Sequence, residues 1–169
     1  AAVDTNKWVQ TTTTMTITQA TGVRTYNAGN SVATTVGALQ TSHRRFPFLQ
    51  RSSLVYRCRF SATTHFSNNL HELGFGNPAT ATTANIGDGS VWRKDGTGQW
   101  VPVVVFNGSE TLGTAISNAT FIALVPPGRY AYAEVMINGG RAHFILSTSL
   151  GVTISEQWID FPDTVSDFA

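Results

Sequence analysis

Two glutamates are the first residues in this sequence whose chemistry suggests a reaction. Glu72 and Glu134 could supply the two carboxyl groups, roughly 5–10 Å apart, between which glycoside hydrolases cleave their substrate. Each glutamate is alone on its predicted strand, and a pair would have to form across neighbouring strands. The basic residues that offer ion-pair partners instead are Arg57, Arg59, Arg141 and His143. We therefore predict no catalytic residues and no enzymatic activity.

Motifs for a metal or an activated nucleophile are missing from the sequence. Asn85, Asp88 and Asn107 lie in plausible loops for calcium, which takes about six to eight oxygen ligands, but no Asp-x-Asp-x-Asp-Gly run is present. The histidines share no metal-type spacing. They are His43, His65, His71 and His143. No Gly-x-Ser-x-Gly motif accompanies the serines. The sequence therefore predicts neither a metal nor a cofactor.

Cys58 is the single cysteine, so no disulfide can form within the chain. It belongs to an alternating run in which Leu54, Tyr56 and Phe60 share its face. Because that face is apolar, we predict a buried and unreactive thiol; a reactive nucleophile is the alternative.

Four aromatic residues are candidates for binding a sugar. Trp92 and Trp100 bracket the turn at Asp95, while Tyr130 and Tyr132 share one face of a predicted strand. An aromatic platform of this kind can stack against sugar rings. Packing of the same rings in the core is the alternative.

A basic, aromatic segment is the candidate for docking to another protein. It consists of His43, Arg44, Arg45, Phe46 and Phe48, with a proline before the last of them. Arginine and aromatic residues dominate the anchors of protein interfaces, so we predict a docking loop. A packed crossover between sheets is the alternative. Two arginines are too small a footprint to predict nucleic-acid binding.

The bulk properties favour a β-rich chain with a polar, weakly charged surface. Of 169 residues, only 12% are charged, the net charge is +1, and threonine is abundant. No apolar run approaches the ~20 residues of a membrane-spanning helix, and no signal peptide is visible. We therefore expect no membrane partner.

Apolar residues recur at every second position rather than at about every 3.6, and Gly or Pro interrupts nearly every window. This pattern predicts about ten strands and no significant helix. The predicted strands are residues 8–18, 24–27, 54–62, 70–76, 91–94, 99–106, 120–125, 130–137, 141–147 and 152–161, with 31–39 as a further strand or an extended arm. Pro102 is predicted to place part of its strand at an edge or in a bulge.

The pattern predicts one antiparallel β-sandwich domain over residues 1–169. Residues 54–161 form its clearest part, and residues 1–53 are less regular and available as an arm. Another Greek-key or barrel arrangement is the alternative.

The region from Leu54 to Leu146 resembles concanavalin A-like, laminin-G-like jelly rolls. The segments that carry the resemblance are Leu54-Val-Tyr-Arg-Cys-Arg-Phe-Ser, His65-Phe-Ser-Asn-Asn-Leu-His-Glu-Leu-Gly-Phe-Gly, Asp88-Gly-Ser-Val-Trp-Arg-Lys-Asp-Gly-Thr-Gly-Gln-Trp-Val, Val105-Phe-Asn-Gly and Tyr130-Ala-Tyr-Ala-Glu-Val-Met-Ile-Asn-Gly-Gly-Arg-Ala-His-Phe-Ile-Leu. More narrowly, the chain is similar to the lectin-like domains that tailed bacteriophages carry as structural proteins of the virion.

This resemblance implies a non-enzymatic virion protein that is made in the host cytoplasm. It implies a capsid decoration or cement protein on the head exterior, whose partners are the major capsid protein and neighbouring copies of itself in a homo-oligomer on the particle. The alternative is a glycan-binding, lectin-like module of a tail fibre, baseplate or other host-facing surface, with a host surface glycan as its partner.

Overall fold

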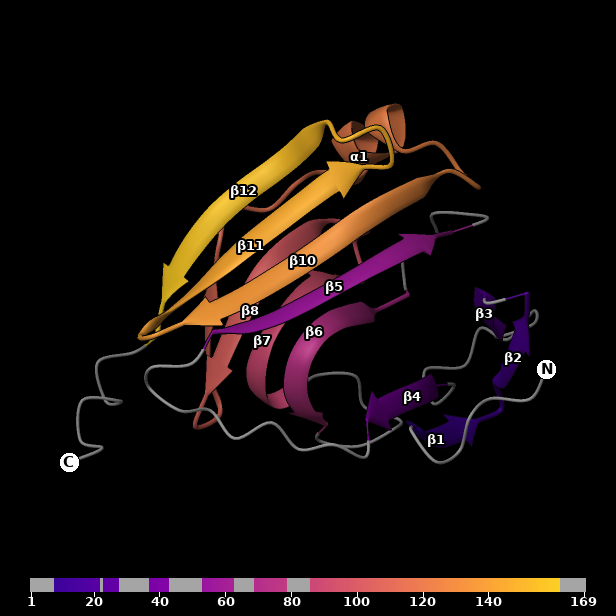
Figure 1. Ribbon diagram of the computed structural model, residues 1–169, viewed down its shortest axis with the longest axis horizontal. Coiled ribbons are helices and arrows are strands. Elements are labelled where there is room, and N and C mark those ends of the chain that lie inside the picture. Colours follow the sequence, from indigo (N-terminus) through magenta and orange to yellow (C-terminus); the bar gives the residue numbers. More distant parts are fainter. Residues whose placement is uncertain are drawn as a thin grey trace. The chain divides into compact units, whose positions relative to one another are not determined.

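The computed structural model describes residues 8–21, 23–27, 37–42, 53–62, 69–78 and 86–161. They form antiparallel sheets and one short helix (Figure 1). The chain divides into two compact units. One unit comprises Ala1–Pro47 and Pro78–Asn85, and the other comprises Phe48–Asn77 and Ile86–Ala169.

The first unit contains two antiparallel pairs of strands. β1 (Trp8–Thr13) pairs with β4 (Gly37–Ser42), and β2 (Thr16–Ala20) pairs with β3 (Val23–Asn27). The single strand predicted over residues 8–18 is therefore wrong, because Thr14 has a left-handed φ of 59° that separates β1 from β2. The predicted strand or arm at residues 31–39 overlaps β4 only at its end, and residues 28–36 lie outside the described part of the chain.

The second unit contains two four-stranded antiparallel sheets. One has the order β12-β11-β10-β5 and the other the order β6-β7-β8-β9. Their strands are β5 (Leu54–Ser61), β6 (His71–Pro78), β7 (Ile86–Lys94), β8 (Trp100–Phe106), β9 (Ser109–Leu112), β10 (Tyr130–Asn138), β11 (Arg141–Thr148) and β12 (Thr153–Asp160). The hairpins predicted around Asp95 and around Asn138-Gly139-Gly140 are confirmed as β7–β8 and β10–β11.

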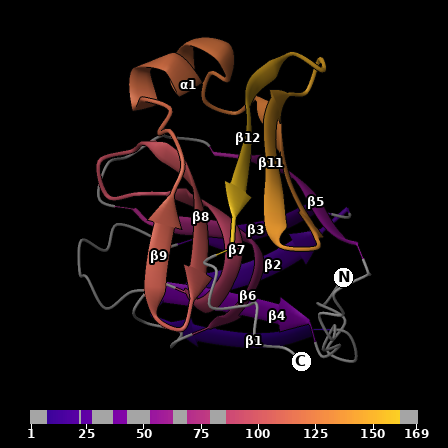
Figure 2. The ribbon, with the colours of Figure 1, turned by 90° about the vertical axis from the view of Figure 1, so that its left-hand side faces the viewer.

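The two sheets of the second unit pack against each other around a common core. Side chains from both sheets are buried in one cluster, together with residues of the helix. They are Trp92, Trp100, Val104, Ile116, Phe121, Val125, Ala131, Ala133, Val135, Ala142, Phe144, Leu146 and Ile159. The indole N–H of Trp92 also crosses between the sheets, donating to the carbonyl oxygens of Glu134 and Ile145 at 3.2 and 3.1 Å. Figure 2 shows β8 and β9 in one layer and β11 and β12 in the other.

The helix α1 (Asn118–Leu124) occupies the segment where a strand was predicted at residues 120–125, so that prediction is wrong. Ser117 caps the helix by accepting a hydrogen bond from the backbone N–H of Thr120 at 3.0 Å. Phe121 and Val125 are four residues apart and both buried, which is the spacing of a helix face. Residues four apart also share one face of a strand, so the spacing of these two residues does not distinguish a helix from a strand. The capping serine was the only sequence signal that favoured a helix.

Pro102 is buried within β8, which lies between β7 and β9, but it stands beyond the last residue pair of β8 with β9, in the part of the strand for which an edge was predicted. In an antiparallel strand the N and O atoms of one residue point to the same neighbour. The carbonyl of Pro102 accepts from the N–H of Gly113 at 2.9 Å, on the β9 side. The N–H that proline lacks therefore faces the place where the β9 ladder ends after Val103 and Leu112, and the β7 ladder loses nothing.

Candidate functional site

The sheet β12-β11-β10-β5 turns one face away from the core, and we call it the outer face. Because successive side chains of a strand alternate, the residues of β10 that lie between its buried Ala131, Ala133, Val135 and Ile137 are on this outer face. The register of the four strands extends the outer face across the sheet. Its larger side chains are Val55, Arg57, Arg59, Tyr130, Tyr132, Glu134, Met136, Arg141, His143, Ile145, Glu156, Trp158 and Asp160.

Arginines and tyrosines pair at the β5 side of the outer face. The guanidinium of Arg59 lies 4.2 Å from the ring centre of Tyr130, and that of Arg57 lies 5.1 Å from the ring centre of Tyr132. Arg57, one of the four partners suggested for the glutamates, also forms an ion pair with Glu134 at 3.4 Å. Arg59 has no carboxylate partner among the described residues.

A second group lies at the β12 side of the outer face. The rings of His143 and Trp158 stack with their centres 4.0 Å apart and their planes 5° apart. His143 Nε2 lies 2.9 Å from the carboxylate of Glu156. Arg141 binds Asp160 at 2.8 Å, and its guanidinium lies 5.3 Å from the Trp158 ring centre. Although these side chains surround it, the indole of Trp158 is 47% exposed.

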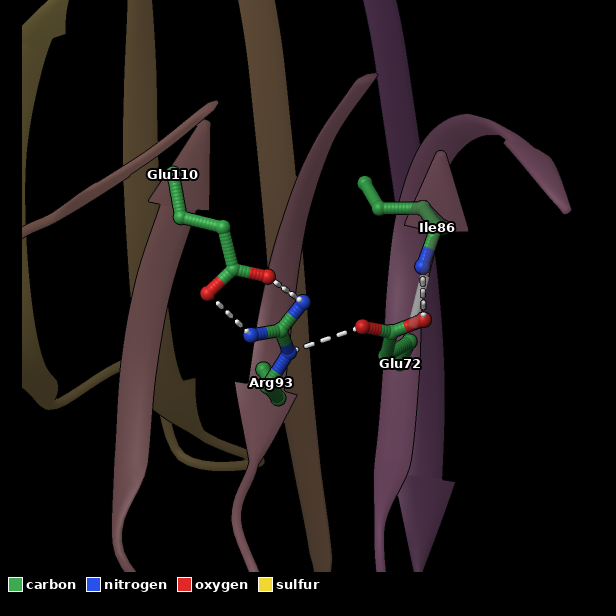
Figure 3. A network of polar contacts seen from close by, with 4 residues as sticks. All are labelled: Glu72, Ile86, Arg93 and Glu110. Carbon is green, nitrogen blue, oxygen red and sulfur yellow. Dashed lines mark hydrogen bonds and ion pairs between the residues drawn. The ribbon is translucent and has the colours of Figure 1, made fainter. Parts of the chain in front are cut away.

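The sheet β6-β7-β8-β9 carries a partly buried charge network on the face that it turns away from the other sheet (Figure 3). Arg93 of β7 donates from Nε to Glu72 of β6 at 2.8 Å, and from both terminal nitrogens to Glu110 of β9 at 2.9 and 2.8 Å. The second oxygen of Glu72 accepts from the backbone N–H of Ile86 at 3.0 Å. Burial alone would lower the pKa of Arg93, but its bonds and charge interactions with Glu110 and Glu72 raise it above the ordinary value. The network ties three strands of this sheet together.

The two glutamates considered for hydrolysis do not meet. Glu134 lies on the outer face, whereas Glu72 bonds to Arg93 on the outward face of the opposite sheet. Arg93 was not among the partners that the sequence suggested for Glu72. All four glutamates of the chain, which are Glu72, Glu110, Glu134 and Glu156, are engaged in ion pairs or the histidine contact.

The four aromatic residues predicted as a glycan face are divided between core and surface. Trp92 and Trp100 are 0% and 3% exposed because the β7–β8 register directs both toward the opposite sheet, so neither can stack on a sugar. Tyr130 and Tyr132 do lie on the outer face and are half-buried. Sequence reasoning missed Trp158 as a surface aromatic, although its alternation with buried Ile159 was a usable signal.

The predicted docking residues His43, Arg44, Arg45, Phe46 and Phe48 lie outside the described residues. Their role stays a prediction.

No group of three or more His, Cys, Asp or Glu side chains is placed to hold a metal ion in the described part of the chain. Of the three residues considered for calcium, Asn85 is outside that part. The carboxylate of Asp88 accepts from the backbone N–H of Asn107 at 2.6 Å, a contact that joins β7 to the β8–β9 turn. No helix among the described residues is long and apolar enough to cross a membrane.

Cys58 lies on the inner face of β5 against the core cluster, where it is partly buried and not fully buried as predicted. Burial raises the pKa of its thiol, and hydrogen bonds with Tyr56 and the backbone of Ala133 offset only part of that effect. We expect iodoacetamide to alkylate Cys58 at least about tenfold more slowly in the folded protein than in denaturant, at one mildly alkaline pH. Mass spectrometry of quenched samples measures both rates. Equal rates would contradict protection of the thiol by its packing against the core.

The fold and contacts define an all-β protein with antiparallel sheets and a sandwich-like core. Comparisons of the chain with protein-family models, with curated proteins and with solved structures find no match.

Proposed function

We propose that the protein is a non-enzymatic structural protein of a tailed-bacteriophage virion, and that it decorates or cements the head exterior. The proposal includes a concanavalin A-like jelly roll for the second unit. The crossover from β5 to its neighbour β10, with four intervening strands in the other sheet, supports that arrangement. The resemblance of residues 54–146 supports the virion assignment.

The proposal that the protein is not an enzyme is supported by the contacts of its carboxylates. Every glutamate is engaged by a basic side chain, and the three described aspartates bind backbone or arginine. A hydrolase needs one carboxyl group free to donate a proton and another free to attack or to activate water. Carboxylates held in this way instead stabilise strands and turns.

The division into two units supports a separation of attachment from display. The first unit holds the less regular N-terminal part of the chain, including the predicted docking residues up to Pro47. We propose that this part contacts the major capsid protein and neighbouring copies of the chain. The second unit would then be presented on the particle surface.

An attachment assay tests this proposal. Purified protein is mixed with particles that lack it, and the bound fraction is measured after sedimentation. We expect the wild-type chain to bind and the Arg44→Glu/Arg45→Glu variant to lose most of its binding, because two interface cations are reversed. The matched control is Arg59→Glu/Arg129→Glu, which reverses two exposed cations of the second unit. Failure of the wild-type chain to bind would contradict decoration, and equal binding of both variants would contradict the docking segment.

A glycan-binding module of a tail fibre, baseplate or host-facing surface is the second candidate. The observation that favours it is the aromatic outer face, where Tyr130, Tyr132 and the exposed Trp158 lie among charged side chains. Aromatic rings beside polar groups are the usual composition of a sugar site.

A further inference from the structure

The indole of Trp158 is an exposed aromatic surface whose orientation is fixed. The buried ring of His143 stacks against one side of it, with 4.0 Å between the ring centres. The guanidinium of Arg141 lies 5.3 Å from the centre of the same ring, and the side chain is still 47% exposed, so part of its aromatic surface is open to a ligand. A ring that is already held in place loses little conformational freedom when a ligand binds to it.

Hydrogen-bonding groups of both kinds surround this ring. Glu156 and Asp160 lie two residues before and after Trp158 on β12, so their carboxylates are on the same face of the sheet. Both are more than half exposed and have oxygens that can accept further bonds. Arg141, on the neighbouring strand β11, supplies N–H groups. The contacts of Arg141 with Asp160 and of His143 with Glu156 hold the four polar side chains in position.

We propose that Trp158, with Arg141, Glu156 and Asp160, forms a binding site for one unit of a neutral glycan. A pyranose ring has an apolar C–H face that can stack on the indole, and its hydroxyl groups can bond to the carboxylates and the guanidinium. The inference rests on the second function, glycan binding, and is independent of attachment to a capsid.

The charges around the ring favour this ligand class over the others. An anionic ligand would meet the carboxylates of Glu156 and Asp160, and a cationic side chain would meet Arg141 beside the ring. A purely apolar partner would remove the charged side chains from water without replacing their hydrogen bonds. A neutral, hydroxyl-rich ligand has none of these penalties.

The test is a titration of the ¹⁵N-labelled protein with neutral hexasaccharides of glucose, mannose and N-acetylglucosamine. The signal of the Trp158 indole N–H, assigned by its loss in Trp158→Phe, reports binding at the site. We expect at least one sugar to shift it saturably, and Trp158→Ala to weaken binding at least about tenfold by calorimetry. Tyr26→Ala is the matched control, because Tyr26 is 46% exposed on β3, and it should leave the affinity unchanged.

A second variant keeps the test valid if Trp158→Ala perturbs the fold. Asp160→Ala removes an exposed acceptor but keeps the ring, and it should weaken binding several-fold. Binding that survives Trp158→Ala but is lost in Tyr132→Ala would overturn this site and leave glycan binding standing. No shift with any hexasaccharide would overturn both. A shift produced only by heparin or by an arginine-rich peptide would also overturn the proposal.

Discussion

Replacing Arg93 with leucine is expected to lower the free energy of unfolding by about 3–5 kcal/mol. Its side chain is 8% exposed, and its guanidinium is the shared partner of Glu72 and Glu110. Removing it leaves two carboxylates, one of them 14% exposed, without a compensating charge. Urea-induced unfolding followed by circular dichroism measures the loss.

Two further variants separate this effect from the loss of an ordinary ion pair. Arg57→Leu removes the partner of Glu134, but Arg57 is 63% exposed, so we expect a change of only about 0–1 kcal/mol. Adding Glu72→Gln and Glu110→Gln to Arg93→Leu should recover part of the loss, because it removes the unpaired charges. If Arg93→Leu were no more destabilising than Arg57→Leu, the network would not support the sheet in the way described.

Alanine at Gly74 or at Gly89 is expected to destabilise the second unit by about 3 kcal/mol. A Cβ on Gly74 would overlap the backbone oxygen of Ser90, and one on Gly89 would overlap the backbone oxygen of Phe75. Both glycines also have positive φ angles, 157° and 150°. The adjacent strands β6 and β7, which are strongly curved in Figure 1, therefore depend on a missing side chain in each.

Gly96→Ala is the matched control for these two variants. Gly96 lies in the β7–β8 turn, and a Cβ added there would have no heavy atom within 4 Å beyond its chain neighbours. Its substitution should change stability by less than about 1 kcal/mol. Thermal unfolding of the three variants gives the comparison, and equal midpoints would show that the close approach of β6 and β7 is not needed.

The strand pattern of the second unit could be predicted from sequence because it depends on local alternation. Leu54 to Ser61 and Tyr130 to Asn138 alternate strictly, and the apolar side predicted for the first of them is the less exposed side of β5. The helix at Asn118–Leu124 could not be recognised in the same way, because Phe121 is its single buried residue and one position shows no periodicity. Its capping residue is a serine, and because serine is frequent in this sequence, that residue alone does not indicate where a helix begins.

The candidate site was harder to predict because it depends on which strands become neighbours. Trp92 and Trp158 look alike in sequence, yet one faces the opposite sheet and the other faces outward. The partner of Glu72 is 21 residues away on a different strand, and no local pattern indicates that pairing. Arg57, which does pair with Glu134, was one of four basic residues suggested as partners of the two glutamates, and the sequence did not say which pair would form.

The most direct test of the proposed virion role is the number of copies of this protein in a purified particle. Quantitative mass spectrometry against the major capsid protein gives that number. A decoration protein should be present in hundreds of copies, in a fixed ratio to the shell. Absence from the particle would contradict a virion role, and a few copies would contradict head decoration and favour a tail or fibre component.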